Sequence, residues 1–211
     1  MTGVTEIQDG VYDVTAKTFA DGRRYRVFLV DGETPTLFDT GFADGADETV
    51  ARIEETGMTP ERIVLTHGDH DHVGGLGTIT EAFDADVWAS AQTDLDGHEP
   101  DHVYDDGDTI GGFEALHVPG HKEDSYAFVD EDRGVMVSGD VVSGSDQRGM
   151  PAGYPVLPPA AYSTDLIALE EGLERLLDYS FDVILVFHGS SILEEGRDRL
   201  DRFVNFPGKP E

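Results

Sequence analysis

The segment IVLTHGDHDHVGG, residues 63–75, restricts what this chain can fold into more than any other part, because an apolar run ends there in three histidines and two aspartates. Residues 63–66 have the composition of a buried strand, and side chains alternate along an extended backbone. His67, Asp69 and Asp71 would therefore share one face. The segment predicts a strand that ends in a cluster of ligand-type groups.

The next residues extend this cluster. A helix that begins near Asp71 would bring His72 beside it, whereas His70 faces away along the extended stretch. The glycines just beyond, Gly74 and Gly75, permit a close approach of the backbone. Neutral imidazole and carboxylate ligands suit zinc, iron or manganese, and four convergent groups exceed what a single catalytic site needs.

Strand-like and helical runs alternate along the chain without a fixed repeat or a linker. This order predicts two sheets packed together, with helices outside, in one domain of residues 1–211. We expect Ser163 or Thr164 to cap the clearest helix. The expected strands are 10–17, 24–32, 34–41, 61–67, 84–90, 109–120, 125–132, 134–140 and 181–189, and the expected helices are 47–57, 72–83, 163–179 and 191–206.

The charge balance is strongly acidic, with 14 basic against 44 acidic residues, a formal net charge of −30 and a pI near 4.2. Apolar runs such as VILVF remain intact, so the pattern indicates a solvated acidic surface and not disorder. Such a surface is typical of proteins from salt-loving microbes, and we expect a halophilic origin. Bulk charge disfavours nucleic acid or an anionic membrane as a partner, although high salt would screen the repulsion.

Other classes are excluded or disfavoured by what the sequence lacks. There are no cysteines, which rules out disulfides and thiolate metal sites. The beginning, MTGVTEIQDG, has neither the basic start nor the apolar stretch of a signal peptide, and no apolar run approaches membrane-spanning length. We therefore expect a cytoplasmic protein with a small-molecule substrate and no membrane partner; the sequence leaves the oligomeric state open.

The segment THGDHDHVGG resembles the H-x-H-x-D-H signature of the metallo-β-lactamase-fold hydrolases. Four further segments are similar to motifs of that family and follow in its order: LFDTG at 37–41, VPGHKEDS at 118–125, SGD at 138–140 and VFHG at 186–189. The five segments together span nearly the whole chain. The resemblance implies an α/β fold, a four-layer αββα sandwich of two mixed β-sheets with outer helices.

Carried over residue by residue, the resemblance implies a centre of two divalent metal ions, zinc in the first place, with manganese or iron as alternatives. One metal would be held by His67, Asp69 and His121, the other by Asp71, His72 and His188, and Asp140 would bridge the two. Two such metals, about 3.5–4 Å apart, share a hydroxide that attacks the substrate. Asp71 would orient this nucleophile or relay a proton, and Asp39 would accept a hydrogen bond from a ligating imidazole.

Asp69 departs from the commonest pattern of the family, which has a histidine at that position. A carboxylate makes this site harder and more anionic, which favours iron or manganese over zinc. It also resembles the flavodiiron oxygen reductases, whose flavin-binding domain has no counterpart in 211 residues. His70 would supply the missing imidazole only if the loop were not extended.

The remaining candidates have structural interpretations that compete with functional ones. We expect His98 and His102 to be exposed and non-ligating, His117 to be a core or supporting residue, and Trp88 to pack in the core. Arg148, Tyr154 and Tyr162 would line the mouth of a pocket. Arg23, Arg24 and Arg26 form either an ordinary strand face or a phosphate contact.

The fold hosts many chemistries, so function has to come from the site. The first hypothesis is a hydrolase that uses the metal-bridging hydroxide on a thioester, ester or lactone, similar to the glyoxalase II-like branch. The chain has almost no cationic side chains that could bind an acidic thiol conjugate, so the sequence does not determine the substrate. The alternative is a phosphodiesterase or nuclease of the same fold, which uses the same two metals and would bind nucleic acid. A di-iron redox protein and an antibiotic hydrolase have less support.

Overall fold

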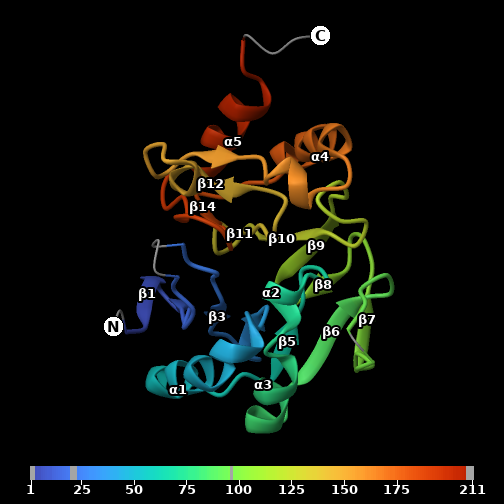
Figure 1. Ribbon diagram of the computed structural model, residues 1–211. Coiled ribbons are helices and arrows are strands. Elements are labelled where there is room, and N and C mark those ends of the chain that lie inside the picture. Colours follow the sequence, from blue (N-terminus) through green and yellow to red (C-terminus); the bar gives the residue numbers. More distant parts are fainter. Residues whose placement is uncertain (1–2, 20–22, 96, 208–211) are drawn as a thin grey trace. The chain divides into compact units, whose positions relative to one another are not determined.

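The computed structural model describes residues 3–19, 23–95 and 97–207, which fall into two compact units, residues 1–105 and 106–211 (Figure 1). Each unit has its own sheet and its own apolar core. That residues 1–211 form a single domain stays a prediction.

The first unit is built on a seven-stranded mixed sheet whose strands follow in sequence order. They are β1 (Thr5–Gln8), β2 (Val11–Asp13), β3 (Phe28–Val30), β4 (Thr36–Phe38), β5 (Arg62–Val64), β6 (Asp86–Ser90) and β7 (His102–Tyr104). Neighbours from β1 to β4 are antiparallel, and neighbours from β4 to β7 are parallel. Parallel neighbours need a crossover connection. The short 3-10 helix η1 (Ala43–Gly45) and α1 (Ala46–Thr56) supply it after β4, and α2 (His70–Val73) and α3 (Leu76–Phe83) supply it after β5.

One face of this sheet packs against α1 and α3. Leu37 of β4 and Ile63 of β5 belong to the same buried cluster as Ile53 of α1 and Ile79 of α3. α1 ends at Gly57, which takes the left-handed conformation with φ 77° and closes the helix as the sequence predicts. The apolar faces of both helices therefore cover one side of the sheet.

The second unit contains a five-stranded mixed sheet in the order β14-β11-β10-β9-β8. Its strands are β8 (Thr109–Ile110), β9 (Phe113–His117), β10 (Tyr126–Asp130), β11 (Val135–Val137) and β14 (Val183–Leu185). Only the β11–β14 pair is parallel. The long connection between these two strands holds a two-stranded sheet and most of the helical turns of this unit: β12 (Ser143–Gly144), η2 (Ser145–Arg148), β13 (Pro155–Val156), η3 (Ala160–Tyr162), α4 (Leu166–Gly172) and η4 (Leu173–Asp178).

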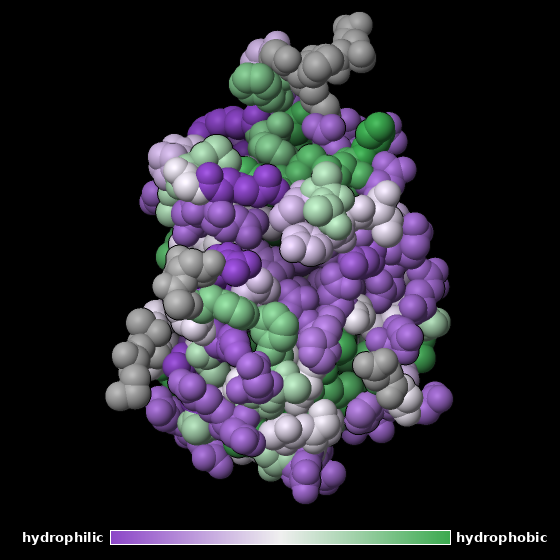
Figure 2. All heavy atoms as spheres, viewed as in Figure 1, coloured by the Kyte–Doolittle hydropathy of each residue, from purple (hydrophilic) through white to green (hydrophobic). Residues whose placement is uncertain are grey.

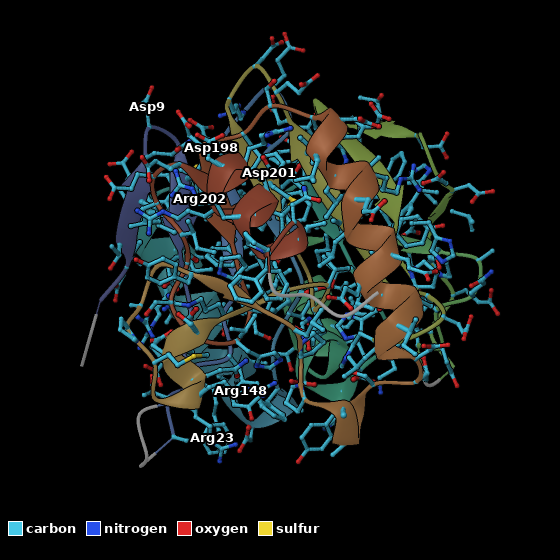
Figure 3. All side chains as sticks on the ribbon, turned by 90° about the horizontal axis from the view of Figure 1, so that it is seen from above. Asp9, Arg23, Arg148, Asp198, Asp201 and Arg202 are labelled. Atoms are coloured by element: carbon cyan, nitrogen blue, oxygen red, sulfur yellow. The ribbon has the colours of Figure 1, made fainter. Side chains whose placement is uncertain are left out.

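The core of the second unit joins its sheet to the helices. Leu169 of α4, Leu176 of η4 and Leu200 of α5 (Gly196–Val204) lie in one buried cluster with sheet residues such as Val129 and Ile184. The other face of α5 carries charges: Asp198, Asp201 and Arg202 project from this helix in Figure 3. Polar residues also dominate the molecular face in Figure 2, as expected for so acidic a chain.

Two mixed sheets with helices confirm the predicted fold class, but some details differ. The helix predicted over 72–83 is divided into α2 and α3. The helix predicted over 163–179 begins at Leu166, and its cap is Asp165, whose carboxylate accepts hydrogen bonds from two backbone N–H groups. The prediction of Ser163 or Thr164 as the cap was wrong, because three good capping residues follow one another and the sequence does not select among them.

Within the described ranges, no helix combines the length and the apolarity that crossing a membrane requires.

Candidate metal centre

In the first unit, the turn after β5 brings two imidazoles and two carboxylates together. His67 and His72 are buried, at 0% and 1% exposure, and their ring centroids lie 4.1 Å apart. The Nε2 atom of His67 is 3.7 Å from Asp69 Oδ2, and the Nε2 atom of His72 is 3.9 Å from Asp71 Oδ2. α2 starts within the motif, so the helix turn places His72 beside Asp71, as predicted.

Asp39 fixes the orientation of His72. This carboxylate follows β4, is fully buried, and has a positive φ of 59°. It lies 2.6 Å from His72 Nδ1, and it accepts hydrogen bonds from the backbone N–H of Thr66 at 2.7 Å and from its hydroxyl at 2.8 Å. Because the carboxylate holds Nδ1–H, the Nε2 atom of His72 keeps its lone pair for a ligand. The supporting contact predicted for Asp39 is therefore present.

Thr66 acts in the same way on His67. Its hydroxyl donates to Asp39, so the hydroxyl oxygen accepts from His67 Nδ1, which is 3.1 Å away. One buried carboxylate thus holds one imidazole directly and the next through Thr66. Both rings present Nε2 to a neighbouring carboxylate.

Two glycines allow this turn to approach the segment after β4 closely. A Cβ atom on Gly74 would lie 2.9 Å from the backbone nitrogen of Ala43, and one on Gly75 would lie 2.5 Å from the carbonyl oxygen of Thr40. Thr40 also donates from its N–H and its hydroxyl to the carbonyl oxygen of His72, at 2.7 and 2.8 Å. The predicted close approach at these glycines is confirmed.

In the second unit, Asp140 lies between two histidines. The Oδ2 atom of Asp140 is 3.4 Å from His121 Nε2 and 3.0 Å from His188 Nε2. Asp140 follows β11 and His188 follows β14, and these two strands are parallel neighbours, so their carboxyl ends carry both residues to the same edge. His121 comes from the turn between β9 and β10. A single carboxylate oxygen within reach of two imidazoles is the arrangement that a bridging ligand needs.

Tight turns hold the two histidines. Gly120 has a φ of 125°, and a Cβ there would lie 2.5 Å from the backbone nitrogen of Leu169. Gly189 has a φ of 84°, and a Cβ there would lie 2.6 Å from the carbonyl oxygen of Gly144. The N–H of Gly144 donates to the carbonyl oxygen of His188 at 2.7 Å. The glycine next to each histidine is therefore required by packing as well as by backbone conformation.

The donor sets of both units fit a divalent metal ion. Neutral imidazole nitrogens and carboxylate oxygens bind zinc, iron and manganese at roughly 2.0–2.2 Å. Two atoms bound to one ion at that distance are separated by about 3–4 Å, which is the range of the nitrogen–oxygen distances within each unit. We therefore regard the seven predicted ligands as chemically suited to a metal.

The other histidines lie in different surroundings. His70 is exposed, with its ring 6.1 Å from that of Phe42. His98 and His102 are exposed, as expected. His117 is half-buried and contacts the carbonyl oxygen of Glu123 at 2.7 Å.

Trp88 does not pack in the core, contrary to the prediction. It is half-buried on β6, stacked on His102 at 4.3 Å, with the Arg62 guanidinium 5.2 Å from its ring centroid. An aromatic residue with apolar sequence neighbours in a strand is predicted to lie in the core, whichever face of the sheet its side chain is on.

Two of the three arginines considered for phosphate contact serve the fold, whereas Arg23 is exposed and donates to the Tyr25 hydroxyl at 3.4 Å. Arg24 and Arg26 both form ion pairs with Asp13, which is buried, and Arg26 is itself buried. Of the residues expected at a pocket mouth, Tyr154 and Tyr162 are 54% and 68% exposed, and Arg148 donates to the carbonyl oxygen of Leu157 at 2.8 Å. Their place at a pocket stays a prediction.

Sequence reasoning did not find Thr66 or Ser163, whose hydroxyls contact the Nδ1 atoms of His67 and His121. Thr66 is adjacent to its histidine, so the position next to the motif was the only signal. Ser163 lies 42 residues from His121, and nothing in the sequence links them.

Comparison with known proteins shows what this chain is similar to. Residues 21–104 match the family model of the metallo-beta-lactamase superfamily. A solved metallo-beta-lactamase from Pontibacter korlensis superposes with a TM-score of 0.77 over 97% of both chains, at 21% identity. The protein TTHA1623, solved in a di-iron-bound form, has a TM-score of 0.67 and 28% identity, over 85% of this chain and 95% of its own.

Curated relatives support the same superfamily. The hydroxyacylglutathione hydrolase GloC of Haemophilus influenzae is 26% identical over 199 residues, which cover 83% of this chain and 89% of that protein. The human acyl-coenzyme A thioesterase MBLAC2 is 26% identical, over 64% of each chain. The chain therefore spans slightly less than two-thirds of this second relative. The fold is that of the metallo-β-lactamases, and the family model and the structural neighbours support this superfamily. Its relatives are named as hydrolases and thioesterases, which confirms the expected enzyme class.

Proposed function

We propose that this chain is a hydrolase that binds two divalent metal ions and cleaves a thioester, ester or lactone. The observation that carries the proposal is the position of Asp140, whose Oδ2 atom lies within 3.4 Å of two imidazole nitrogens. In the proposed centre, His67, Asp69 and His121 hold one ion, Asp71, His72 and His188 hold the other, and Asp140 serves both.

The chemistry expected of the ions is Lewis acidity toward the substrate oxygen and a lowered pKa of a coordinated water. The residues of the chain prepare the ligands for this role. Asp39 and Thr66 hold the Nδ1 atoms of His72 and His67, which leaves both Nε2 atoms available. Asp71 is half-buried and not fully enclosed, and in the proposed centre its carboxylate would orient the attacking water and accept its proton.

The choice of substrate class rests on relatives and on charge. Hydroxyacylglutathione and acyl-coenzyme A are both thioesters, and relatives named for them cover most of this chain. A phosphodiester substrate would need cations at the site. Of the three first candidates, Arg24 and Arg26 are engaged by Asp13, and Arg23 is exposed and donates to the Tyr25 hydroxyl. We therefore favour acyl transfer to water over phosphodiester cleavage.

The donor set determines which metal ions the proposed site prefers. Asp69 replaces an imidazole with a harder oxygen ligand, which suits iron and manganese as well as zinc. TTHA1623 holds two irons. The proposal is accordingly a pair of divalent ions from this group, and not zinc alone.

The test is hydrolysis by the metal-loaded protein in multimolar potassium chloride. We expect cleavage of a hydroxyacylglutathione or an acyl-coenzyme A, loss of that cleavage in Asp71→Ala, and full cleavage in His98→Ala, whose residue is an exposed histidine. Turnover of a generic phosphodiester without thioester cleavage would refute the substrate class. Two bound irons with neither activity would refute hydrolysis and favour a redox role.

A further inference from the structure

The ring of His121 has a hydroxyl partner that comes from a distant part of the second unit. The Oγ atom of Ser163 lies 3.2 Å from His121 Nδ1 and 3.1 Å from the carbonyl oxygen of Pro159. His121 Nε2, on the other side of the ring, is 3.4 Å from Asp140 Oδ2. The two nitrogens therefore face different partners.

One arrangement of the hydrogens satisfies both contacts of the Ser163 hydroxyl. A carbonyl oxygen accepts and cannot donate, so the single hydroxyl hydrogen of Ser163 goes to Pro159. The oxygen of Ser163 then accepts from His121, which places the ring hydrogen on Nδ1. A neutral imidazole with its hydrogen on Nδ1 has a lone pair on Nε2, the atom that faces Asp140.

The backbone around Ser163 is held against the His121 turn. The N–H of Thr164 donates to the carbonyl oxygens of Gly120 and His121, both at 3.0 Å, and the N–H of Asp165 donates to that of Gly120 at 2.8 Å. Asp165 also caps α4 through its side chain. The start of α4 is thereby fixed to the ligand turn, so the Ser163 hydroxyl is placed in advance and little conformational entropy is lost when it binds the ring.

We propose that Ser163 is a positioning residue for the metal centre: it holds the Nδ1–H of His121 and so keeps Nε2 directed to the ion. This inference rests on the proposed function, because it takes His121 to be a ligand. It adds a residue outside the motif segments, and it links metal affinity to the segment that precedes α4. Partners of this kind, when removed, typically cost ten- to a hundred-fold in metal affinity.

Three variants separate this role from a general structural one. Ser163→Ala removes the hydroxyl, and Ser163→Thr restores it at a position whose extended backbone, φ −108° and ψ 148°, suits threonine. Thr164→Val is the matched control. It removes the Thr164 hydroxyl bond to the carbonyl oxygen of Gly120, 3.1 Å, but leaves the ring of His121 untouched.

The first measurement is zinc affinity by competition with a chromophoric chelator, in multimolar salt at pH 8. We expect two zinc ions in the wild type, one of them held ten- to a hundred-fold more weakly in Ser163→Ala, and near-wild-type affinity in Ser163→Thr and Thr164→Val. If the wild type binds two ions and Ser163→Ala binds both equally well, the inference is overturned while the proposed function stands. If the wild type binds none of zinc, manganese and iron, the proposed function fails first, and the inference fails with it.

The second measurement is the ¹⁵N–¹H spectrum of the imidazole nitrogens in the zinc-loaded protein. The Nδ1–H signal of His121 should be visible and protected from exchange in the wild type and in Ser163→Thr. It should exchange rapidly in Ser163→Ala and stay protected in Thr164→Val. Equal protection in Ser163→Ala, or weakened affinity in Thr164→Val of the same size, would show a merely structural role and overturn the proposal.

Discussion

Replacement of Asp39 is the perturbation whose cost is most fully defined by the structure. This carboxylate is 0% exposed and has three donors, which are the backbone N–H and the hydroxyl of Thr66 and the Nδ1–H of His72. Hydrogen bonds to charged groups contribute about 1.5–3 kcal/mol each, but they are not additive within one network. Removing one partner of a buried charged network typically costs about 3–5 kcal/mol.

Backbone conformation adds a second contribution. Asp39 has a φ of 59°, and alanine in this left-handed region costs about 1–2 kcal/mol. We therefore expect Asp39→Ala to lower the free energy of unfolding by about 4–7 kcal/mol, a large part of the stability of a typical domain. Asp39→Asn should cost about half as much, because asparagine tolerates the left-handed region and still accepts one bond.

A matched control separates the two contributions. Asp84 has a φ of 52°, ends α3 and is exposed, so Asp84→Ala carries the backbone cost without the three hydrogen bonds. The assay is urea unfolding of metal-free protein in multimolar potassium chloride, followed by circular dichroism. The reasoning is refuted if Asp39→Ala is no more destabilised than Asp84→Ala, within about 1 kcal/mol.

The remaining predictions concern catalysis, packing, pH and salt. Asp140→Ala should abolish hydrolysis and the binding of a metal pair together, while His98→Ala changes neither; metal analysis of both variants checks this. Gly120→Ala should cost at least about 2–3 kcal/mol in urea unfolding, since a Cβ would overlap the start of α4; an unchanged urea midpoint would contradict it. The hydrogen bond from Tyr179 to Glu114, with partial burial, raises the pKa of Tyr179 to about 12. Its contribution to stability is therefore complete below about pH 10 and lost as the pH rises through 12, and thermal melts should show this loss in the wild type but not in Tyr179→Phe. With a net charge of −30, the thermal midpoint should rise steeply between low and multimolar salt; a flat response would argue against a halophilic chain.

The sequence was informative where one strand end carries both apolar and ligating residues. The order of strands and helices in the first unit follows from Gly and Asp between apolar runs, and the turn after β5 follows from alternation and the helix that begins there. Asp39 was singled out because LFDTG resembles a family motif, and its supporting role was inferred because a ligating imidazole needs a partner for its second nitrogen.

The sequence could not predict the contacts that short polar side chains make. Ser163 looks like a helix cap, and a hydroxyl in such a position is explained locally before any distant contact is considered. Only the folded β9–β10 turn brings His121 to it. Trp88 was misplaced for a related reason, since strand composition does not tell which flank of an aromatic side chain is covered.

The most direct test of the central claim is the number of metal ions bound per chain. The protein would be stripped with a chelator, reloaded in turn with zinc, manganese or iron in multimolar salt, desalted, and analysed by mass spectrometry of the metal and by protein concentration. The proposed centre predicts two ions per chain for at least one of these metals, and fewer than two in Asp140→Ala. No bound metal in the wild type, or two ions retained by Asp140→Ala, would contradict the account.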